Sequence, residues 1–100
     1  MNKITEITLI SQVTTYSDIG VPTQTPTETK VIGNLQTVSA QEFFRGGQLG
    51  IKPELIAVIW AKEYNGEVLV EINGKRYIIY RTYTMNDGRV ELYCQKDVGA

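Results

Sequence analysis

The chain has 100 residues, of which 42% are hydrophobic and 21% are charged, and its formal net charge is -1. This length corresponds to one domain that buries roughly two-thirds of the surface of its unfolded chain. The charge balance gives no general attraction to nucleic acid or to an anionic membrane, although a local basic patch would be compatible with it. With no histidine and one cysteine, the chain cannot build a Cys/His metal site, a histidine-based triad or an intramolecular disulfide.

The first third of the chain is predicted to contribute two strands. Residues 4–16 alternate apolar and polar side chains and are rich in β-branched residues, a pattern typical of a half-buried strand. A second strand is expected over residues 30–38, where Gly33 interrupts the apolar pattern. The chain begins without a long apolar stretch, and no run approaches the ~18 apolar residues of a membrane span. We therefore expect neither a signal peptide nor a membrane segment.

Residues 17–30, between these two strands, are expected to form an exposed loop or arm. Threonine occupies every second position from Thr23 to Thr29, and Pro26 discourages strand pairing. We favour an exposed hairpin loop or edge strand. The alternative is an arm that pairs with a neighbouring subunit.

Residues 39–52 are predicted to form a helix-loop insert. The run Ser39-Ala40-Gln41-Glu42 matches a capping box, in which the Ser39 side chain accepts from the Glu42 amide and the Glu42 carboxylate binds back to the Ser39 amide. The helix is expected to be short and to end at Gly46 and Gly47, since glycine accepts the left-handed conformation that follows a helix.

Residues 55–96 contain four strand-like runs separated by three turn signals. Asn65-Gly66 and Asn73-Gly74 are expected to form two-residue type I′ turns, which need positive φ at both positions. Asp87-Gly88 is the third signal. This spacing predicts an antiparallel meander of consecutive strands.

The turns also predict which residues face each other across the strands. Around Asn73-Gly74, the expected pairs are Val70 with Tyr77, Val68 with Ile79, and Glu71 with Arg76. Around Asn65-Gly66 they are Ala61 with Val70 and Lys62 with Leu69, and Tyr83 is expected opposite Leu92 or Val90.

This register gives the meander one apolar face. Its members are Ile59, Ala61, Val68, Val70, Ile72, Tyr77, Ile79, Val90, Leu92 and Cys94. The other face carries Lys62, Glu71, Arg76, Thr82 and Glu91. It also carries apolar and aromatic residues that need cover from a strand, a helix or a second subunit. These are Val58, Trp60, Leu69, Ile78, Tyr80 and Tyr93. Arg81 falls on the apolar face by parity, so either a bulge redirects it or it pairs with a carboxylate.

The element order is therefore β-β-α-β-β-β-β within a single domain, residues 1–100. The predicted fold class is mainly β: a small antiparallel six-stranded β-barrel, or a partly open barrel or sandwich, with one short helix inserted between strands 2 and 3.

The residue inventory offers little for catalysis. Without histidine, the remaining candidates are carboxylate pairs such as Glu63/Glu67 and Glu67/Glu71, which we interpret as solvated strand ends beside lysine and arginine. Cys94 is expected to be a buried small hydrophobe. We expect no enzymatic activity and no cofactor.

The alternative is a small β-barrel module that binds single-stranded nucleic acid or another protein. Nucleic acid is suggested by Lys75-Arg76-Tyr77 and Tyr80-Arg81-Thr82-Tyr83, which interleave cations with aromatic rings. In the predicted register, however, Tyr77 and Tyr83 point inward and Tyr80 outward, so the rings do not form one platform. Tyrosines with buried rings and exposed hydroxyls are the simpler interpretation.

The order of these features resembles the head–tail joining (head closure or stopper) proteins of long-tailed bacteriophages, including prophages of Gram-positive bacteria. The resemblance rests on ITLIS, SAQEFFRGGQLGIKPE, EYNGEVLVEINGKRYIIYRTY and VELYCQKDVG. It covers most of the chain, is weakest over residues 17–30, and its motifs are structural rather than catalytic.

The resemblance implies a β-barrel subunit of a ring with about twelve copies and cyclic symmetry. Subunits of this family can be monomeric in solution and form the ring only on their binding platform. Such a ring would lie in the virion neck, between the portal and adaptor on one side and the tail completion protein on the other. It would form in the host cytoplasm and retain the packaged double-stranded DNA that passes through its channel. The slightly acidic balance suits a channel that DNA must pass without sticking.

The resemblance also implies positions for the site residues. The insert Ala40–Lys52 is expected to face the channel, with Phe43, Phe44, Arg45, Gly46, Gly47, Gly50 and Lys52. In a ring, the residues expected at the interface between subunits or partners are Trp60, Leu69, Ile78 and Tyr80.

Overall fold

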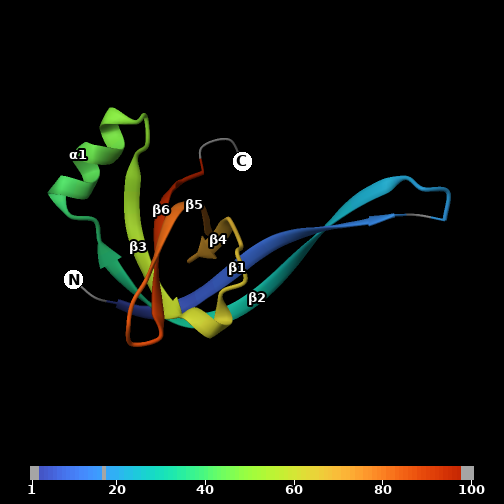
Figure 1. Cartoon of the computed structure of the whole chain (residues 1–100), viewed down its shortest axis with the longest axis horizontal. Helices are drawn as coiled ribbons and strands as arrows, with labels where there is room; N and C mark the ends of the chain where they lie inside the picture. Colours follow the sequence, from blue (N-terminus) through green and yellow to red (C-terminus); the bar gives the residue numbers. More distant parts are fainter. Residues whose placement is uncertain (1–2, 17, 98–100) are drawn as a thin grey trace.

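Six antiparallel strands close into a barrel in the order β1-β2-β3-β6-β5-β4 (Figure 1). The computed structural model describes residues 3–16 and 18–97. The strands are β1 (Lys3–Tyr16), β2 (Pro22–Thr37), β3 (Pro53–Trp60), β4 (Leu69–Ile72), β5 (Lys75–Thr84) and β6 (Arg89–Lys96). The helix α1 (Ala40–Gln48) lies between β2 and β3, and a short 3-10 helix, η1 (Ala61–Glu63), follows β3. The predicted fold class is confirmed.

The predicted meander of consecutive strands is wrong at its first turn. β3 pairs with β2 and β6, whereas β4 pairs with β1 and β5, so Ala61 does not face Val70 and Lys62 does not face Leu69. The second turn is confirmed: Asn73 and Gly74 have φ values of 53° and 77°, and Val70 lies opposite Tyr77.

The segment after β3 departs from a hairpin because Glu67 organises it as a loop. The Glu67 carboxylate accepts a hydrogen bond from the Asn65 amide at 2.8 Å, and the Tyr64 hydroxyl donates to the Glu67 carbonyl at 2.7 Å. Glu67 is only 6% exposed, so the prediction that this carboxylate is a solvated strand end is wrong. The chain can then cross from β3 to pair β4 with β1.

The barrel interior holds most of the apolar face predicted from the sequence. The core consists of Ile7, Leu9, Val31, Ala57, Ile59, Val70, Ile72, Tyr77, Ile79, Val90, Leu92 and Cys94. Ala61 packs against this core while partly exposed. The sequence predicts that Val68 is buried, but its side chain is 59% exposed, because Val68 lies just before the first residue of β4, Leu69. Cys94 is buried as predicted, and its thiol donates to the Leu92 carbonyl.

Gly33 does not interrupt the apolar pattern of β2 but occupies one of its inward-facing positions. A Cβ at this position would lie 2.5 Å from Ile7 Cδ1 and 2.8 Å from both Ile59 Cγ2 and the Val58 carbonyl oxygen. Only glycine therefore allows β2 to approach these neighbours so closely.

A bulge in β5 shifts its pairing with β6 between Ile79 and Arg81. Beyond the bulge, Tyr83 lies opposite Glu91 and is 57% exposed, so the prediction that Tyr83 points inward opposite Leu92 or Val90 is wrong. The same bulge carries Arg81 to the outer face. Both explanations considered for Arg81 apply, since it also pairs with a carboxylate.

The β1–β2 hairpin extends well beyond the barrel (Figure 1). β2 begins at Pro22, so much of the segment expected as a loop or arm is strand, and Pro26 lies opposite Gln12 within the ladder. β4 joins β1 only at Thr8–Ile10, and β3 joins β2 only at Asn34–Thr37. Residues 11–16 and 22–27 thus pair only with each other, and we call this ribbon, with residues 18–21 at its tip, the arm.

Candidate interaction site: the helical insert and its anchor

The helix α1 begins with the cap that the sequence predicts. The Ser39 hydroxyl accepts a hydrogen bond from the Glu42 amide at 3.1 Å. The second half of the capping box is wrong, because the Glu42 carboxylate binds β5 instead of the Ser39 amide. The helix also continues past Gly46 and Gly47 to Gln48, and Gly50, with φ of 77°, is the left-handed residue beyond its end.

Gly46 packs α1 closely against the start of β3. It is the buried residue of the helix, and a Cβ there would lie 2.6 Å from Pro53 Cγ. The Ile51 amide donates to the Gly46 carbonyl at 2.8 Å, which fixes the chain as it leaves the helix. Gly47 faces open space. The two glycines therefore differ in role. The lack of a side chain at Gly46 lets the helix pack against Pro53, whereas no close contact requires a glycine at position 47.

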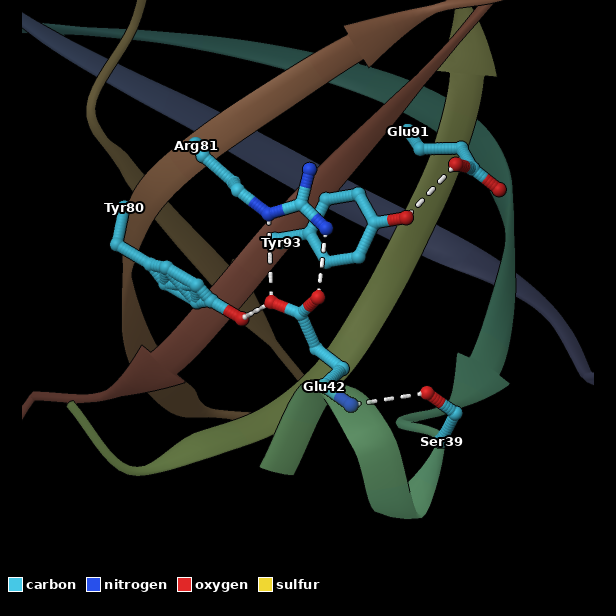
Figure 2. A network of polar contacts seen from close by, with 6 residues as sticks. All are labelled: Ser39, Glu42, Tyr80, Arg81, Glu91 and Tyr93. Atoms are coloured by element: carbon cyan, nitrogen blue, oxygen red, sulfur yellow. Dashed lines mark hydrogen bonds and ion pairs between the residues drawn. The ribbon is translucent and has the colours of Figure 1, made fainter. Parts of the chain in front are cut away.

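Glu42 joins the helix to the outer face of the barrel (Figure 2). Arg81 donates from Nη2 to Glu42 Oε1 at 2.6 Å and from Nε to Oε2 at 3.3 Å. The Tyr80 hydroxyl donates to Oε2 at 2.6 Å. Since the Glu42 side chain is only 11% exposed, the carboxylate is held within a fixed set of donors, which is the geometry of a strong charge-assisted contact.

Two further residues of β6 complete this network, which we call the anchor (Ser39, Glu42, Tyr80, Arg81, Glu91 and Tyr93). The Arg81 guanidinium carbon lies 3.7 Å from the centre of the Tyr93 ring, a cation–π contact. The Tyr93 hydroxyl donates to Glu91 Oε1 at 2.9 Å. The anchor therefore supplies part of the cover that the outward aromatic residues were expected to need.

The electrostatics follow from this arrangement. The Arg81 guanidinium lowers the pKa of Glu42, and its effect exceeds that of partial burial, which acts in the opposite direction. Burial, followed by the hydrogen bond to Glu42, raises the pKa of Tyr80. The hydrogen bond to Glu42 also raises the pKa of Arg81. Around neutral pH the Glu42 carboxylate, the Arg81 guanidinium and the neutral Tyr80 hydroxyl thus form a structural set rather than a proton-transfer pair.

The rest of the insert is exposed. Phe43 and Phe44 are 53% and 70% exposed, with their rings edge to face at 6.2 Å. Leu49 is 73% exposed. Of the other residues predicted for the insert, Arg45, Gly47, Gly50 and Lys52 are exposed and Gly46 is buried. The helix thus presents apolar side chains to solvent while its carboxylate is tied down.

The four predicted interface residues do not form one patch. Leu69 and Ile78 are half-buried and lie opposite each other on β4 and β5. Tyr80 belongs to the anchor, and Trp60, 51% exposed, lies at the end of β3. Trp60 instead lines a groove with Ile4 and Ile32, which sequence reasoning missed. The sequence feature that could have revealed this groove is the presence of apolar residues, Ile4 and Ile32, at outward-facing positions of β1 and β2.

Comparison with known proteins adds no assignment: no model of a protein family matches the chain, and no curated protein is similar to it. No described helix is long and apolar enough to cross a membrane. Over residues 3–16 and 18–97, no group of three or more acidic, cysteine or histidine side chains is placed to hold a metal ion. The fold and the site define a small closed β-barrel that carries an anchored helical insert.

Proposed function

We propose that this chain is a structural subunit of the neck of a long-tailed bacteriophage, a ring-forming head closure protein. In this role it would connect the portal and adaptor to the tail completion protein and retain packaged DNA. The proposal starts from the ordered set of sequence features that resembles that family. A closed barrel with a helical insert between β2 and β3 is compatible with it.

The observation that carries the proposal is the apolar exposure of the insert. Phe43 and Phe44 on α1 and Leu49 at its C-cap are each more than half exposed. Such a cluster of exposed apolar side chains is typical of a surface that contacts a partner. The anchor fixes this helix to the barrel through hydrogen bonds to the Glu42 carboxylate. Such an arrangement suits a segment that meets a neighbour or lines a channel in an assembly.

The charges of the insert are compatible with a channel that DNA traverses. Arg45 and Lys52 are the cations of residues 40–52, and Glu42 is the acidic residue. Few cations mean few phosphate contacts, so DNA would pass without being trapped. In the assembled neck, roughly twelve copies would present their inserts to the same channel.

The proposal is tested by disrupting the gene in the phage that encodes it and restoring it on a plasmid. Without the protein we expect free tails and heads that lose their DNA, and the wild-type gene should restore plaques. A Phe43→Ser/Phe44→Ser variant should fold but fail to restore them, whereas Gly47→Ala, a change at an open position of the same helix, should restore them. Normal virions in the absence of the gene would contradict the proposal.

A module for single-stranded nucleic acid remains the alternative function, with weaker support. Tyr80 and Arg81 are engaged in the anchor, and Tyr77 is only 8% exposed. Lys75, Arg76 and Lys96 do line one surface hollow, but Glu54 and Asp97 line it with them. Binding at low salt that weakens on Arg76→Ala would favour this function, and no binding at low salt would end it.

A further inference from the structure

The arm ends in an apolar tip that is largely exposed to solvent. Ile19 is 85% exposed and Val21 is 50% exposed. Behind the tip, residues 11–16 and 22–27 form a ribbon of two strands without a third. An isolated two-stranded ribbon is marginally stable in water, and its open edges favour pairing with another chain. The arm is therefore a feature that gains stability from a partner.

A groove lined mostly by apolar residues lies on the outer face of the barrel, near the start of β1 and the end of β3. We call it the groove, and its outward-facing lining residues are Ile4, Ile32, Asn34, Val58, Trp60 and Arg89. Its volume is about 300 Å³, which is sufficient for one or two side chains. Three of its apolar members are more than half exposed: Ile4 at 76%, Ile32 at 62% and Trp60 at 51%.

We propose that the tip of the arm of one copy, led by Ile19, inserts into the groove of a second copy. The occupant is assigned to a second copy because the chain itself carries a matching pair of exposed apolar surfaces. Figure 1 shows the arm tip at one extreme of the long axis, with the start of β1 and the end of β3 toward the other. Within one molecule the tip and the strand ends that line the groove lie far apart along the long axis, so the proposed contact forms between molecules.

The charges of the two surfaces are complementary. Asp18 is the one charged residue between positions 11 and 27, and Arg89 is the one charged residue that lines the groove. Arg89 already binds Asp87 through Nε and Nη2. Its guanidinium has five N–H donors and the side chain is 41% exposed, so it can also donate to a second carboxylate. Seating Ile19 would bring the adjacent Asp18 to this rim.

The groove also contains a polar atom suited to an incoming backbone. Asn34 Oδ1 is buried and has no hydrogen-bond partner among the described residues, a state that proteins seldom leave uncompensated. A backbone N–H of the seated tip would donate a hydrogen bond to Asn34 Oδ1. The contact would thus combine apolar burial, a charge pair and one hydrogen bond.

A tip-in-groove contact is head-to-tail, because it uses different surfaces on the two molecules. Heterologous contacts generate a ring if the rotation closes and an open chain of subunits if it does not. The contact goes beyond the proposed function, since it is a property of the purified chain. A ring could also use other surfaces, so the two proposals can fail separately.

The test uses two single variants of the full chain and their mixture, measured by sedimentation velocity up to about 1 mM. Wild type should self-associate, and Ile19→Asp (tip) and Ile32→Asp (groove) should each weaken self-association roughly 10- to 100-fold. Mixing the two variants leaves one intact tip and one intact groove, so the mixture should form a 1:1 heterodimer. Val68→Asp, a control with similar exposure that lines neither surface, should behave as wild type.

Circular dichroism and thermal unfolding should show that all three variants keep the wild-type fold, and Ile19→Ser and Ile32→Ser replace any that does not. As a second measurement, Ile19→Cys and Ile32→Cys chains mixed under mild oxidation should cross-link to each other in preference to themselves. A wild-type chain that is monomeric at 1 mM would overturn the proposal and leave the tip to a different protein. Self-association that survives Ile19→Asp, or a mixture that forms no heterodimer, would overturn it as well.

Discussion

Glu42 in α1 and Arg81 in β5 form an ion pair, with Arg81 Nη2 2.6 Å from Glu42 Oε1. The two residues are 39 positions apart in the sequence. Glu42 also lies in the first turn of α1, where a negative charge stabilises the helix through its dipole. One carboxylate therefore both stabilises the helix and fixes it to the barrel. Replacing Glu42 should destabilise α1 more than it destabilises the strands.

Glu42→Gln should lower the free energy of unfolding by about 1–2 kcal/mol, because it replaces charge-assisted hydrogen bonds with neutral ones. Urea unfolding measures the change. Relative to wild type, amide hydrogen exchange in the variant should accelerate more in residues 40–48 than in β6. Asp87→Asn is the control: the Asp87–Arg89 pair is close to half exposed on both sides, and such surface pairs contribute little to stability because solvent screens them. An equal loss in the two variants would contradict a special role for Glu42.

The anchor should weaken in acid. The pKa of Glu42 in the folded chain is lowered from its ordinary value of 4.5, so its contribution to stability is complete above that value and is lost as the pH falls through the folded pKa. The stability difference between wild type and Glu42→Gln should thus be constant near neutrality and shrink below pH 4.5. Denaturant unfolding at a series of pH values measures it, and a difference that stays constant into strong acid would refute this origin.

The two helix glycines should respond to alanine with opposite signs. Gly46→Ala places a Cβ 2.6 Å from Pro53 Cγ, so the helix must shift, at a cost of about 1–3 kcal/mol. Gly47→Ala meets nothing within 4 Å and should stabilise the chain by about 0.5–1 kcal/mol, since alanine favours the helix. Thermal unfolding distinguishes the two, and destabilisation by Gly47→Ala would show that the helix is seated differently.

Sequence patterns predicted those parts of the structure that depend on neighbours along the chain. The Asn73-Gly74 turn fixed the Val70–Tyr77 pairing, and alternation identified most of the core. The β3–β4 link was mispredicted because Asn65-Gly66 matches a hairpin turn, whereas the buried Glu67 holds a loop there. Nothing local in the sequence shows that a carboxylate will be buried.

The candidate site was predicted less completely, because it depends on contacts between distant segments. The capping signal located the start of α1, but the partner of Glu42 lies on β5, where a bulge decides which way Arg81 points. The groove combines residues of four strands, β1, β2, β3 and β6. The predicted meander placed β3 beside β4, whereas β3 lies between β2 and β6. Gly33 was read as an interruption, although its lack of a side chain is what the contact with Ile7 requires.

Gly33→Ala should lower the free energy of unfolding by roughly 1–3 kcal/mol, because the added methyl group overpacks the barrel interior. Its nearest neighbour is Ile7 Cδ1 at 2.5 Å, and Ile7→Val removes that atom. The double variant should therefore be more stable than the sum of the two single changes predicts, by an amount that a double-mutant cycle measures. Strict additivity would mean that the clash with the Val58 carbonyl oxygen, not with Ile7, dominates.

Leu69→Ala should separate assembly from folding if the neck proposal is correct. Leu69 is half-buried opposite Ile78 on the outside of the barrel, so truncation should remove only part of a buried side chain and lower stability by about 1 kcal/mol. Val70→Ala, at the neighbouring fully buried position, should lower it by roughly 1–3 kcal/mol. Plaque restoration should nevertheless fall further for Leu69→Ala, because Leu69 would contact a neighbouring subunit and Val70 would not. Plaque restoration that simply follows the stability of the two variants would place Leu69 outside any interface.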